Sequence, residues 1–304
     1  MPHPTIDPLV EAAYRIEPFY DPATSTLSYL LVDTATHACA AIDAVLDYQA
    51  NTGHTCTASA DRLVARVREL GGRLEWILET HVHADHLSAA SYLKQALGGR
   101  IGIGARIRQV QATFGRWFGV PGQTWDGSPF DSVFDDGANL RVGNLELRVL
   151  HTPGHTPACV SYLLEGPGMP AAFVGDTLFS PDYGTARCDF PGGDPHALYH
   201  SVRRVLSLPG ATRLLLCHDY RPGGRELVWC ATVAEQRAEN VHVHAGVTEA
   251  AFVALRQARD ATLAMPALML PAVQVNMRAG QLPEADANGM RYLRIPLNQF
   301  QDPS

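Results

Sequence analysis

The stretch THVHADH at residues 80–86 restricts the fold of this chain more than any other feature. It places His81, His83, Asp85 and His86 within six positions, at the end of the strand-like segment RLEWILETH (73–81). Imidazoles packed this closely repel one another once they are protonated, so the cluster gains no stability by itself. We therefore interpret it as a binding site at the end of a buried strand.

Other residues of metal-binding type also follow apolar, strand-like runs. His151 and His155 come after LRVL, Asp176 comes after AAFVG, and His218 comes after RLLLC. Loops at strand ends can aim side chains at a common point while the strands themselves stay in the core. We therefore expect these residues to converge with the first cluster.

The alternation of apolar and polar segments predicts a mixed sheet covered by helices, rather than a pure series of strand–helix–strand units. The runs at 25–33 and 37–43 predict a hairpin. Asp194 followed by Pro195 is typical of a helix start. Residues 115–137 are rich in Gly, Pro and Asp and are expected to form a long loop. Further strands are expected at 100–105, 145–150, 159–164, 171–176 and 213–219, and helices at 57–72, 86–99, 194–206, 225–240 and 248–262.

The 304 residues are enough for one large α/β domain with an appendage or for two average domains. We expect an N-terminal segment at 1–24, a catalytic domain at 25–245, and a helical, proline-containing C-terminal extension at 246–304 that packs on it. The net charge of −7 argues against a nucleic-acid partner, because proteins that bind polyanions usually carry a basic excess.

No apolar run approaches the ~20 residues needed to span a membrane, so no membrane partner is expected. The first twenty residues have neither a signal-peptide core nor the Arg-rich look of a transit peptide, which favours a cytoplasmic location. Six cysteines occur without any C-x-x-C pair, which is typical of free, mostly buried thiols in a reducing compartment. Whether the chain forms a homodimer is left open.

Histidines that do not follow a strand-like run are not interpreted as metal ligands. His196 and His200 lie four positions apart on an expected helix and share one face, without an obvious carboxylate partner. We expect the remaining histidines to be surface residues: His3, His37, His54, His242 and His244.

Neutral imidazole and carboxylate are ligands that suit zinc, iron and manganese. A single histidine in such a position is more often a hydrogen-bonded surface residue, but that reading does not explain an ordered set at successive strand ends. The candidate ligands are His81, His83, Asp85, His86, His155, Asp176 and His218.

Four motifs, THVHADH, HTPGHT, VGDTLF and CHDY, resemble in this order those of the metallo-β-lactamase superfamily. The resemblance covers about residues 25 to 240. It implies an α/β fold in the form of a four-layer αββα sandwich with mixed sheets, and a metal site at one edge between the two sheets.

Within that family, two enzyme chemistries compete. A dinuclear hydrolase similar to glyoxalase II, which cleaves a glutathione thioester, would bind two Zn, Fe or Mn ions. Two neighbouring ions lower the pKa of a shared water and hold both oxygens of a displacement. The resemblance then implies His81, His83 and His155 on one ion, Asp85, His86 and His218 on the other, and Asp176 between them.

The second reading is a mononuclear iron persulfide dioxygenase, an enzyme of sulfide metabolism. The segments ARCDF (186–190), LYHSVRRVLSLPG (198–210) and PAVQVNMRAG (271–280) resemble persulfide dioxygenases, and the last is not expected in a glyoxalase II. The resemblance implies one Fe(II) held by His81, His155 and Asp176. Two histidines and one carboxylate leave open positions where a substrate sulfur and O₂ can bind side by side.

This resemblance also implies roles for the other residues. Glutathione persulfide and O₂ would be the substrates, and sulfite and glutathione the products. His83, Asp85, His86 and His218 would orient ligands and move protons, or would be remnants of a dinuclear ancestor with no role. Glutathione carries two carboxylates, so cations are expected at the mouth of the site. The candidates are Arg187, Tyr220, Arg221 and Arg278, each of which could equally be a surface residue. A non-catalytic metal-binding scaffold is the third reading, and the complete ligand set disfavours it.

Overall fold

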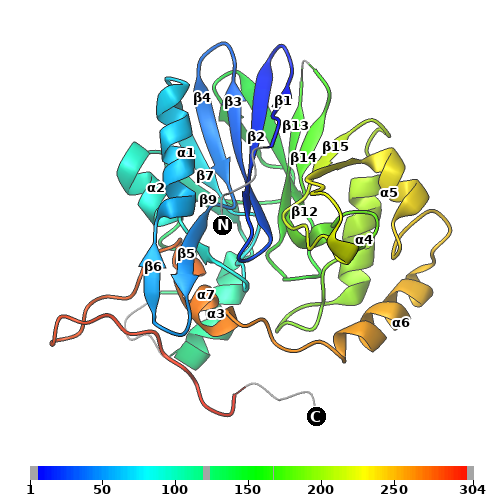
Figure 1. Ribbon diagram of the computed structural model, residues 1–304. Coiled ribbons are helices and arrows are strands. Elements are labelled where there is room, and N and C mark those ends of the chain that lie inside the picture. The colour runs from blue at the N-terminus through cyan, green and yellow to red at the C-terminus, as the bar shows by residue number, and fades with distance from the viewer. Residues whose placement is uncertain (1–5, 119–123, 167, 300–304) are drawn as a thin grey trace.

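The computed structural model describes residues 6–118, 124–166 and 168–299. Within these residues, the first large sheet contains antiparallel pairs at one edge and parallel pairs at the other (Figure 1). The predicted hairpin is present, since β3 pairs antiparallel with β4. In spatial order the strands are β1 (Leu9–Val10), β2 (Tyr14–Asp21), β3 (Thr26–Asp33), β4 (Ala38–Ile42), β7 (Arg73–Leu78), β9 (Arg100–Gly104) and β10 (Ser132–Phe134).

The second large sheet is antiparallel except where β14 and β15 run parallel. In spatial order its strands are β11 (Asn139–Val142), β12 (Leu145–His151), β13 (Val160–Glu165), β14 (Ala171–Phe173), β15 (Arg213–Leu215) and β16 (Cys230–Thr232). A small third sheet joins β6 (His54–Cys56), β5 (Val45–Gln49) and β8 (Leu87–Ser88). The described strands therefore form mixed sheets, as the sequence predicts.

The two large sheets pack face to face around an apolar core. Tyr29 and Ile42 from the first sheet belong to the same buried cluster as Leu147, Tyr162 and Phe173 from the second. The rings of Tyr29 and Phe173 meet edge to face, with their centroids 5.4 Å apart. Burying apolar area between the sheets is the main source of stability in such a sandwich.

Helices cover the outer faces of both sheets. A second buried cluster joins the first sheet to α1, α2, α3 and α7, and a third joins the second sheet to α4, α5 and α6. This arrangement confirms the expected αββα sandwich (Figure 1). The helices are α1 (Ala58–Glu69), α2 (Ala90–Leu97), α3 (Ile107–Phe118), α4 (Pro195–Leu206), α5 (Val233–Glu239), α6 (Glu249–Asp260) and α7 (Met269–Asn276), with 3₁₀ turns at Gly175–Thr177 and Pro222–Gly224.

The start of α4 follows from its sequence. The Asp194 carboxylate accepts a hydrogen bond from the backbone N–H of His196, and Pro195 occupies the first helical position. The carboxylate satisfies a backbone donor that the helix leaves unpaired, and proline loses nothing there because its missing N–H would be unpaired anyway. The sequence prediction for this helix is confirmed.

Several expected boundaries differ in the structure. The expected loop at 115–137 includes the end of α3 and strand β10, and residues 119–123 lie outside the described part. The expected helix at 225–240 contains β16 before the shorter α5 begins, and the expected helix at 86–99 begins only after β8. The segment at 1–24 contributes β1 and β2 to the first sheet.

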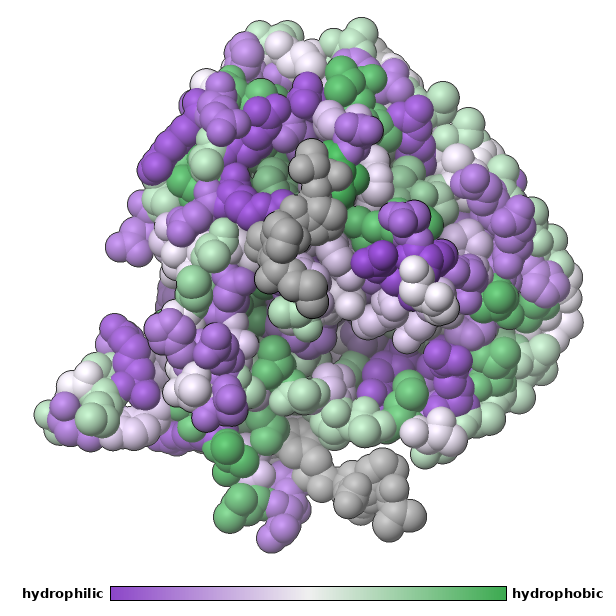
Figure 2. Space-filling view, in the orientation of Figure 1, coloured by the Kyte–Doolittle hydropathy of each residue, from purple (hydrophilic) through white to green (hydrophobic). Residues whose placement is uncertain are grey.

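The C-terminal extension packs on the body through α6 and α7, and its last part, 281–299, runs as an extended arm away from the sheets (Figure 1). Figure 2 shows hydrophilic and apolar residues interspersed over this face of the molecule. All six cysteines are free thiols, as expected. None of the helices described is both long and apolar enough to cross a membrane.

Candidate metal centre

The ends of four strands bring the predicted donors to one edge of the sandwich. The loop after β7 carries the first cluster, and the loop after β12 carries His155. Asp176 lies in the 3₁₀ turn after β14, and His218 follows β15. The seven donors therefore come from both large sheets, and their side chains meet where the two sheets leave an opening.

His81, His155 and Asp176 form the first group. The Asp176 Oδ2 atom lies 3.8 Å from Nε2 of His81 and 3.6 Å from Nε2 of His155. One donor atom from each residue lies within 4.8 Å of the other two, and all three residues are buried. The structure thus brings together the triad expected for a single ion.

Each histidine of this triad is oriented through its other ring nitrogen. Nδ1 of His155 donates a hydrogen bond to the backbone carbonyl of Arg187 at 2.8 Å. Nδ1 of His81 lies 3.0 Å from the hydroxyl of Thr80. Contacts of this kind fix the ring and leave the Nε2 lone pair pointing inward for a metal.

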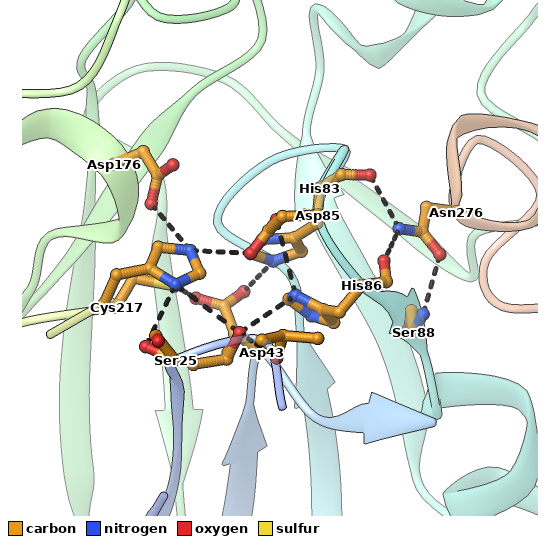
Figure 3. Close-up of polar contacts among 12 residues, drawn as sticks. Ser25, Asp43, His83, Asp85, His86, Ser88, Asp176, Cys217 and Asn276 are labelled. Carbon is orange, nitrogen blue, oxygen red and sulfur yellow. Dashed lines mark hydrogen bonds and ion pairs between the residues drawn. The ribbon is translucent and has the colours of Figure 1, made fainter. Parts of the chain in front are cut away.

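Asp85, His86 and His218 lie beside the triad. Nε2 of His218 lies 3.3 Å from Oδ1 of Asp176 and 3.3 Å from Oδ2 of Asp85 (Figure 3). Nδ1 of His86 lies 3.5 Å from Oδ1 of Asp85. The hydroxyl of Thr26, in β3, contacts the Nδ1 atoms of both His86 and His218, at 3.4 and 3.5 Å. Thr26 therefore contacts the rings of both histidines in this second group.

His83 faces two buried carboxylates. Its Nε2 lies 3.0 Å from Oδ1 of Asp43 and 3.5 Å from Oε2 of Glu79. Burial disfavours the charged imidazole, but the charges and hydrogen bonds of Asp43 and Glu79 outweigh it and raise the pKa of His83 well above its usual value. Asp43 also accepts hydrogen bonds from the backbone and hydroxyl of Thr80, which couples this carboxylate to the loop that begins the site.

The protonation of the other groups also suits a cation. Burial, with the neighbouring His83 and His155, lowers the pKa of His81 well below its usual value, so its imidazole is neutral. Burial opposes ionisation of Asp85, but the charges of His218 and His86 outweigh it and lower its pKa well below the usual value. A neutral imidazole and an ionised carboxylate are the forms that bind metal.

A further observation tests whether a metal fits. Buried polar atoms without a partner are costly and rare, so a group of them facing one space needs an explanation. Within the described part of the chain, six such atoms belong to the predicted ligands: Nε2 of His81, Nδ1 of His83, Oδ2 of Asp85, Nε2 of His86, Oδ1 of Asp176 and Nε2 of His218. A metal ion satisfies nitrogen and oxygen lone pairs of this kind, so the residues present fit the metal that the motifs imply.

The site opens into a cavity of about 410 Å³. Asp85, His155 and Asp176 line it on the metal side, and apolar and aromatic residues line its walls. Among the latter are Phe179, Tyr183, Phe190, Tyr220 and Leu268. A mostly apolar pocket with polar groups at one end is the usual form of a small-molecule site.

Two of the four expected substrate-binding residues line this cavity, Arg187 and Tyr220. Arg187 is already paired with Asp189, at 2.5 Å. Arg221 is absent from the lining, and its Nε donates to the carbonyl of Arg225. Arg278 lines a separate cavity of about 180 Å³ beside α7. The structure therefore does not bring Arg221 and Arg278 to the candidate site.

Sequence reasoning did not find Arg256 and Arg259, which line the cavity from α6. Arg256 is buried beside Asp260, and its Nε has no hydrogen-bond partner among the described residues. Arg259 is exposed, and its guanidinium lies 5.7 Å from the ring centre of Tyr183. The sequence predicts the helix at 248–262, but no local signal shows which face of that helix meets the cavity.

Two interpretations of other histidines need correction. His242 is buried rather than on the surface, and its Nδ1 accepts a hydrogen bond from the backbone N–H of Thr185 at 3.1 Å. His196 and His200 do have a carboxylate partner, Glu249 of α6, at 2.8 and 3.3 Å. Both contacts depend on segments that are distant in the sequence.

Comparison with known proteins places this geometry in a family. The model of the metallo-β-lactamase superfamily matches residues 29–218. The chain is 60% identical to a probable metallo-hydrolase of Burkholderia pseudomallei, over 93% of this chain and 99% of that protein. It is 46% identical to glyoxylase B2 of Dictyostelium discoideum, over 94% of this chain and 98% of that protein.

It is also similar to proteins named for sulfur chemistry. The human mitochondrial persulfide dioxygenase ETHE1 is 31% identical over 90% of this chain and 92% of that protein. The crystal structure of ETHE1 from Myxococcus xanthus matches with a TM-score of 0.69 and 31% identity, over 88% of this chain and 99% of that chain. Together with the ordered donors, these matches show that the chain belongs to the metallo-β-lactamase superfamily.

Proposed function

We propose that this chain is a mononuclear non-haem iron persulfide dioxygenase, which oxidises glutathione persulfide with O₂ to sulfite and glutathione. The observation that carries the proposal is the grouping of His81, His155 and Asp176, whose donor atoms lie within 4.8 Å of one another. Similarity to the human persulfide dioxygenase and to the Myxococcus xanthus structure supports the same choice.

His83 is oriented by carboxylates outside the triad. Its Nε2 lies 3.0 Å from Asp43 and 3.5 Å from Glu79. In the one-iron form that we propose, His81, His155 and Asp176 alone hold the ion, and His83 lies beside them as a residue that orients the site.

Bound Fe(II) would supply adjacent open coordination positions for the substrate sulfur and O₂. Asp176 and the two imidazoles would fix its position, since each imidazole is held by a contact on its far side. His218 lies between the Asp85 and Asp176 carboxylates, which line the cavity, so its Nε2 is placed to hold a proton or pass it to either of them. The apolar wall around Phe190 and Leu268 would exclude bulk water from the reacting atoms.

The cavity also suits an anionic thiol derivative. Glutathione has two carboxylates, and Arg259 and Arg256 line the same cavity as the metal-side residues Asp85 and Asp176. Among the described residues, Arg259 forms no ion pair and so keeps its guanidinium for a substrate carboxylate, whereas Arg187 is committed to Asp189. Arg256 is likewise paired, with Asp260, and is buried. We therefore propose that Arg259, in place of Arg221 and Arg278, is the cation that recognises the substrate.

The test is anaerobic purification, elemental analysis and an oxygen-electrode assay with glutathione persulfide. The proposal expects about one equivalent of iron per chain and oxygen uptake that depends on the persulfide. A protein with one iron but no oxygen uptake, or with uptake after iron has been removed, would refute it.

A dinuclear thioester hydrolase is the second candidate, and one observation favours it. Within the described residues, Oδ2 of Asp85, Nε2 of His86 and Nε2 of His218 are buried without hydrogen-bond partners, as ligands of a second ion would be. The similarity to glyoxylase B2 points the same way. Two equivalents of zinc, iron or manganese together with cleavage of S-lactoylglutathione would favour this function over the dioxygenase.

A further inference from the structure

Asn276, the last residue of α7, contacts the loop that carries the histidine cluster. Its side-chain amide donates hydrogen bonds to the backbone carbonyls of His83 and His86, both at 2.8 Å, and its Oδ1 accepts one from the backbone N–H of Ser88 at 2.7 Å (Figure 3). Asn276 is 4% exposed, so these contacts form away from water. A residue almost 200 positions along the chain thus holds both ends of the stretch from His83 to Ser88.

The chemistry of the side chain matches this position closely. Two carbonyls require two donors and one N–H requires an acceptor, and a single side-chain amide supplies all three. Aspartate has the same shape but no N–H to give to the carbonyls, and alanine leaves all three backbone groups without this partner. An unpaired buried backbone group costs about as much as a lost hydrogen bond.

The rest of the C-terminal segment fixes Asn276 in place. The side chain of Gln111, in α3, donates a hydrogen bond to the carbonyl of Met277 at 2.9 Å. After α7 the chain turns through Gly280, whose φ is +76°, and a Cβ atom there would lie 2.7 Å from the carbonyl oxygen of Ser88. A side chain at position 280 would therefore push α7 away from the loop.

Asn276 forms hydrogen bonds with only one part of the site. Its three hydrogen bonds are to His83, His86 and Ser88, on either side of Asp85, whereas no hydrogen bond described for it involves His81, His155 or Asp176. We propose that Asn276 is a positioning residue for the metal site. It fixes the backbone on both sides of Asp85, and so holds the His83 ring against that of His81, with centroids 4.0 Å apart, and holds Asp85 near His218, which contacts Asp176. Through these contacts Asn276 affects the strength with which the site binds metal, whether the site holds one ion or two. The inference rests on the metal-dependent function proposed above, but not on the choice between persulfide and thioester.

The experiment compares Asn276→Ala and Asn276→Asp with Gln274→Ala. Gln274 lies in the same helix, is also buried, and forms hydrogen bonds with the backbone of Leu270 and Arg294 instead of the loop. It is therefore a matched control for lost hydrogen bonds in α7. Fe²⁺ is titrated into each metal-free protein under anaerobic conditions, and Co²⁺ is used as a spectroscopic probe of the ligands.

Both Asn276 variants are expected to bind Fe²⁺ about tenfold to a hundredfold more weakly than the wild type and to show a changed Co²⁺ absorption spectrum, because residues that orient ligands typically have effects of that size. Gln274→Ala should keep wild-type affinity and spectrum. If Asn276→Ala does not fold, Asn276→Asp decides, since it keeps the shape and the bond from Ser88. Wild-type affinity in Asn276→Asp, or an equal loss in Gln274→Ala, would overturn the inference. These readouts do not involve turnover, so a failed dioxygenase assay leaves them interpretable.

Discussion

Nε2 of His218 lies 3.3 Å from one carboxylate oxygen of Asp176, and Nε2 of His155 lies 3.6 Å from the other. Asp176 therefore stands between the two groups of donors and can contribute to either. Its turn follows β14 directly, so the second sheet fixes its position. We therefore expect every metal-bound form of the protein to depend on Asp176.

The first prediction is that Asp176→Ala abolishes iron retention and persulfide-dependent oxygen uptake. The triad would keep only two imidazoles, and the change would also remove the negative charge that offsets the cation. Asp182→Ala is the control, because Asp182 forms its ion pair with Arg225 outside the donor set. Elemental analysis and the oxygen electrode measure the effect. Full activity in Asp176→Ala would contradict the assignment of the triad.

The second prediction concerns His218→Ala. The variant should keep about one equivalent of iron, because His81, His155 and Asp176 remain, but should lose about 10²-fold or more in turnover if His218 moves a proton. Metal analysis and steady-state kinetics distinguish the two effects. Loss of half the bound metal from a protein that starts with two equivalents would instead indicate a dinuclear site.

The third prediction is that Arg259→Gln raises KM for glutathione persulfide by roughly tenfold or more and changes kcat little. A hydrogen bond to a charged group contributes about 1.5–3 kcal/mol, and the substitution removes the charge but keeps a donor. Arg68→Gln, at an exposed position of α1, is the control for loss of a surface arginine. An unchanged KM would show that the substrate carboxylates bind elsewhere.

The fourth prediction is a pH dependence of stability that arises from His242. Burial, with the positive charges of Arg256 and Arg259, lowers the pKa of His242 from 6.5 to about 4. Below pH 6.5 the unfolded chain binds a proton that the folded chain refuses, so stability falls as the pH drops from 6.5 towards 4, by at most roughly 3 kcal/mol. The loss is complete near pH 4, and above pH 6.5 this group contributes no pH dependence.

His242→Asn tests this assignment. Asparagine does not titrate here and can offer its Oδ1 to the N–H of Thr185 in place of Nδ1. Denaturant unfolding of both proteins between pH 4.5 and 7.5 should give a smaller pH slope for the variant. Parallel curves would mean that His242 is not a source of the acid sensitivity.

The convergence of the candidate donors could be predicted from sequence because each lies next to a recognisable strand. His81, His155 and His218 all follow short apolar runs, and strand ends gather at sheet edges whatever the details of packing. The contacts that orient them could not be predicted in this way. Asp43 lies 40 positions before His83, and only the pairing of β4 with β7 brings them together.

The candidate substrate-binding residues, in contrast, could not be located from sequence motifs. Arg278 lies in a motif that resembles the persulfide dioxygenases, but α7 directs Asn276 to the metal loop and leaves Arg278 at another cavity. The sequence pattern does not predict α7 itself, although Pro271 at its third position is compatible with a first helical turn. Arg259 reaches the main cavity only because α6 packs against α4.

The donors come from loops of both large sheets, so a bound ion would cross-link the two sheets at this edge of the sandwich. Removing the ion would remove this cross-link as well as the reactive metal, and would leave buried imidazoles and carboxylates that need water as a hydrogen-bond partner. We therefore expect the metal-free protein to open locally along this edge, while the apolar core between the sheets stays packed. Binding of the ion would then both complete the catalytic site and make this edge of the fold more rigid.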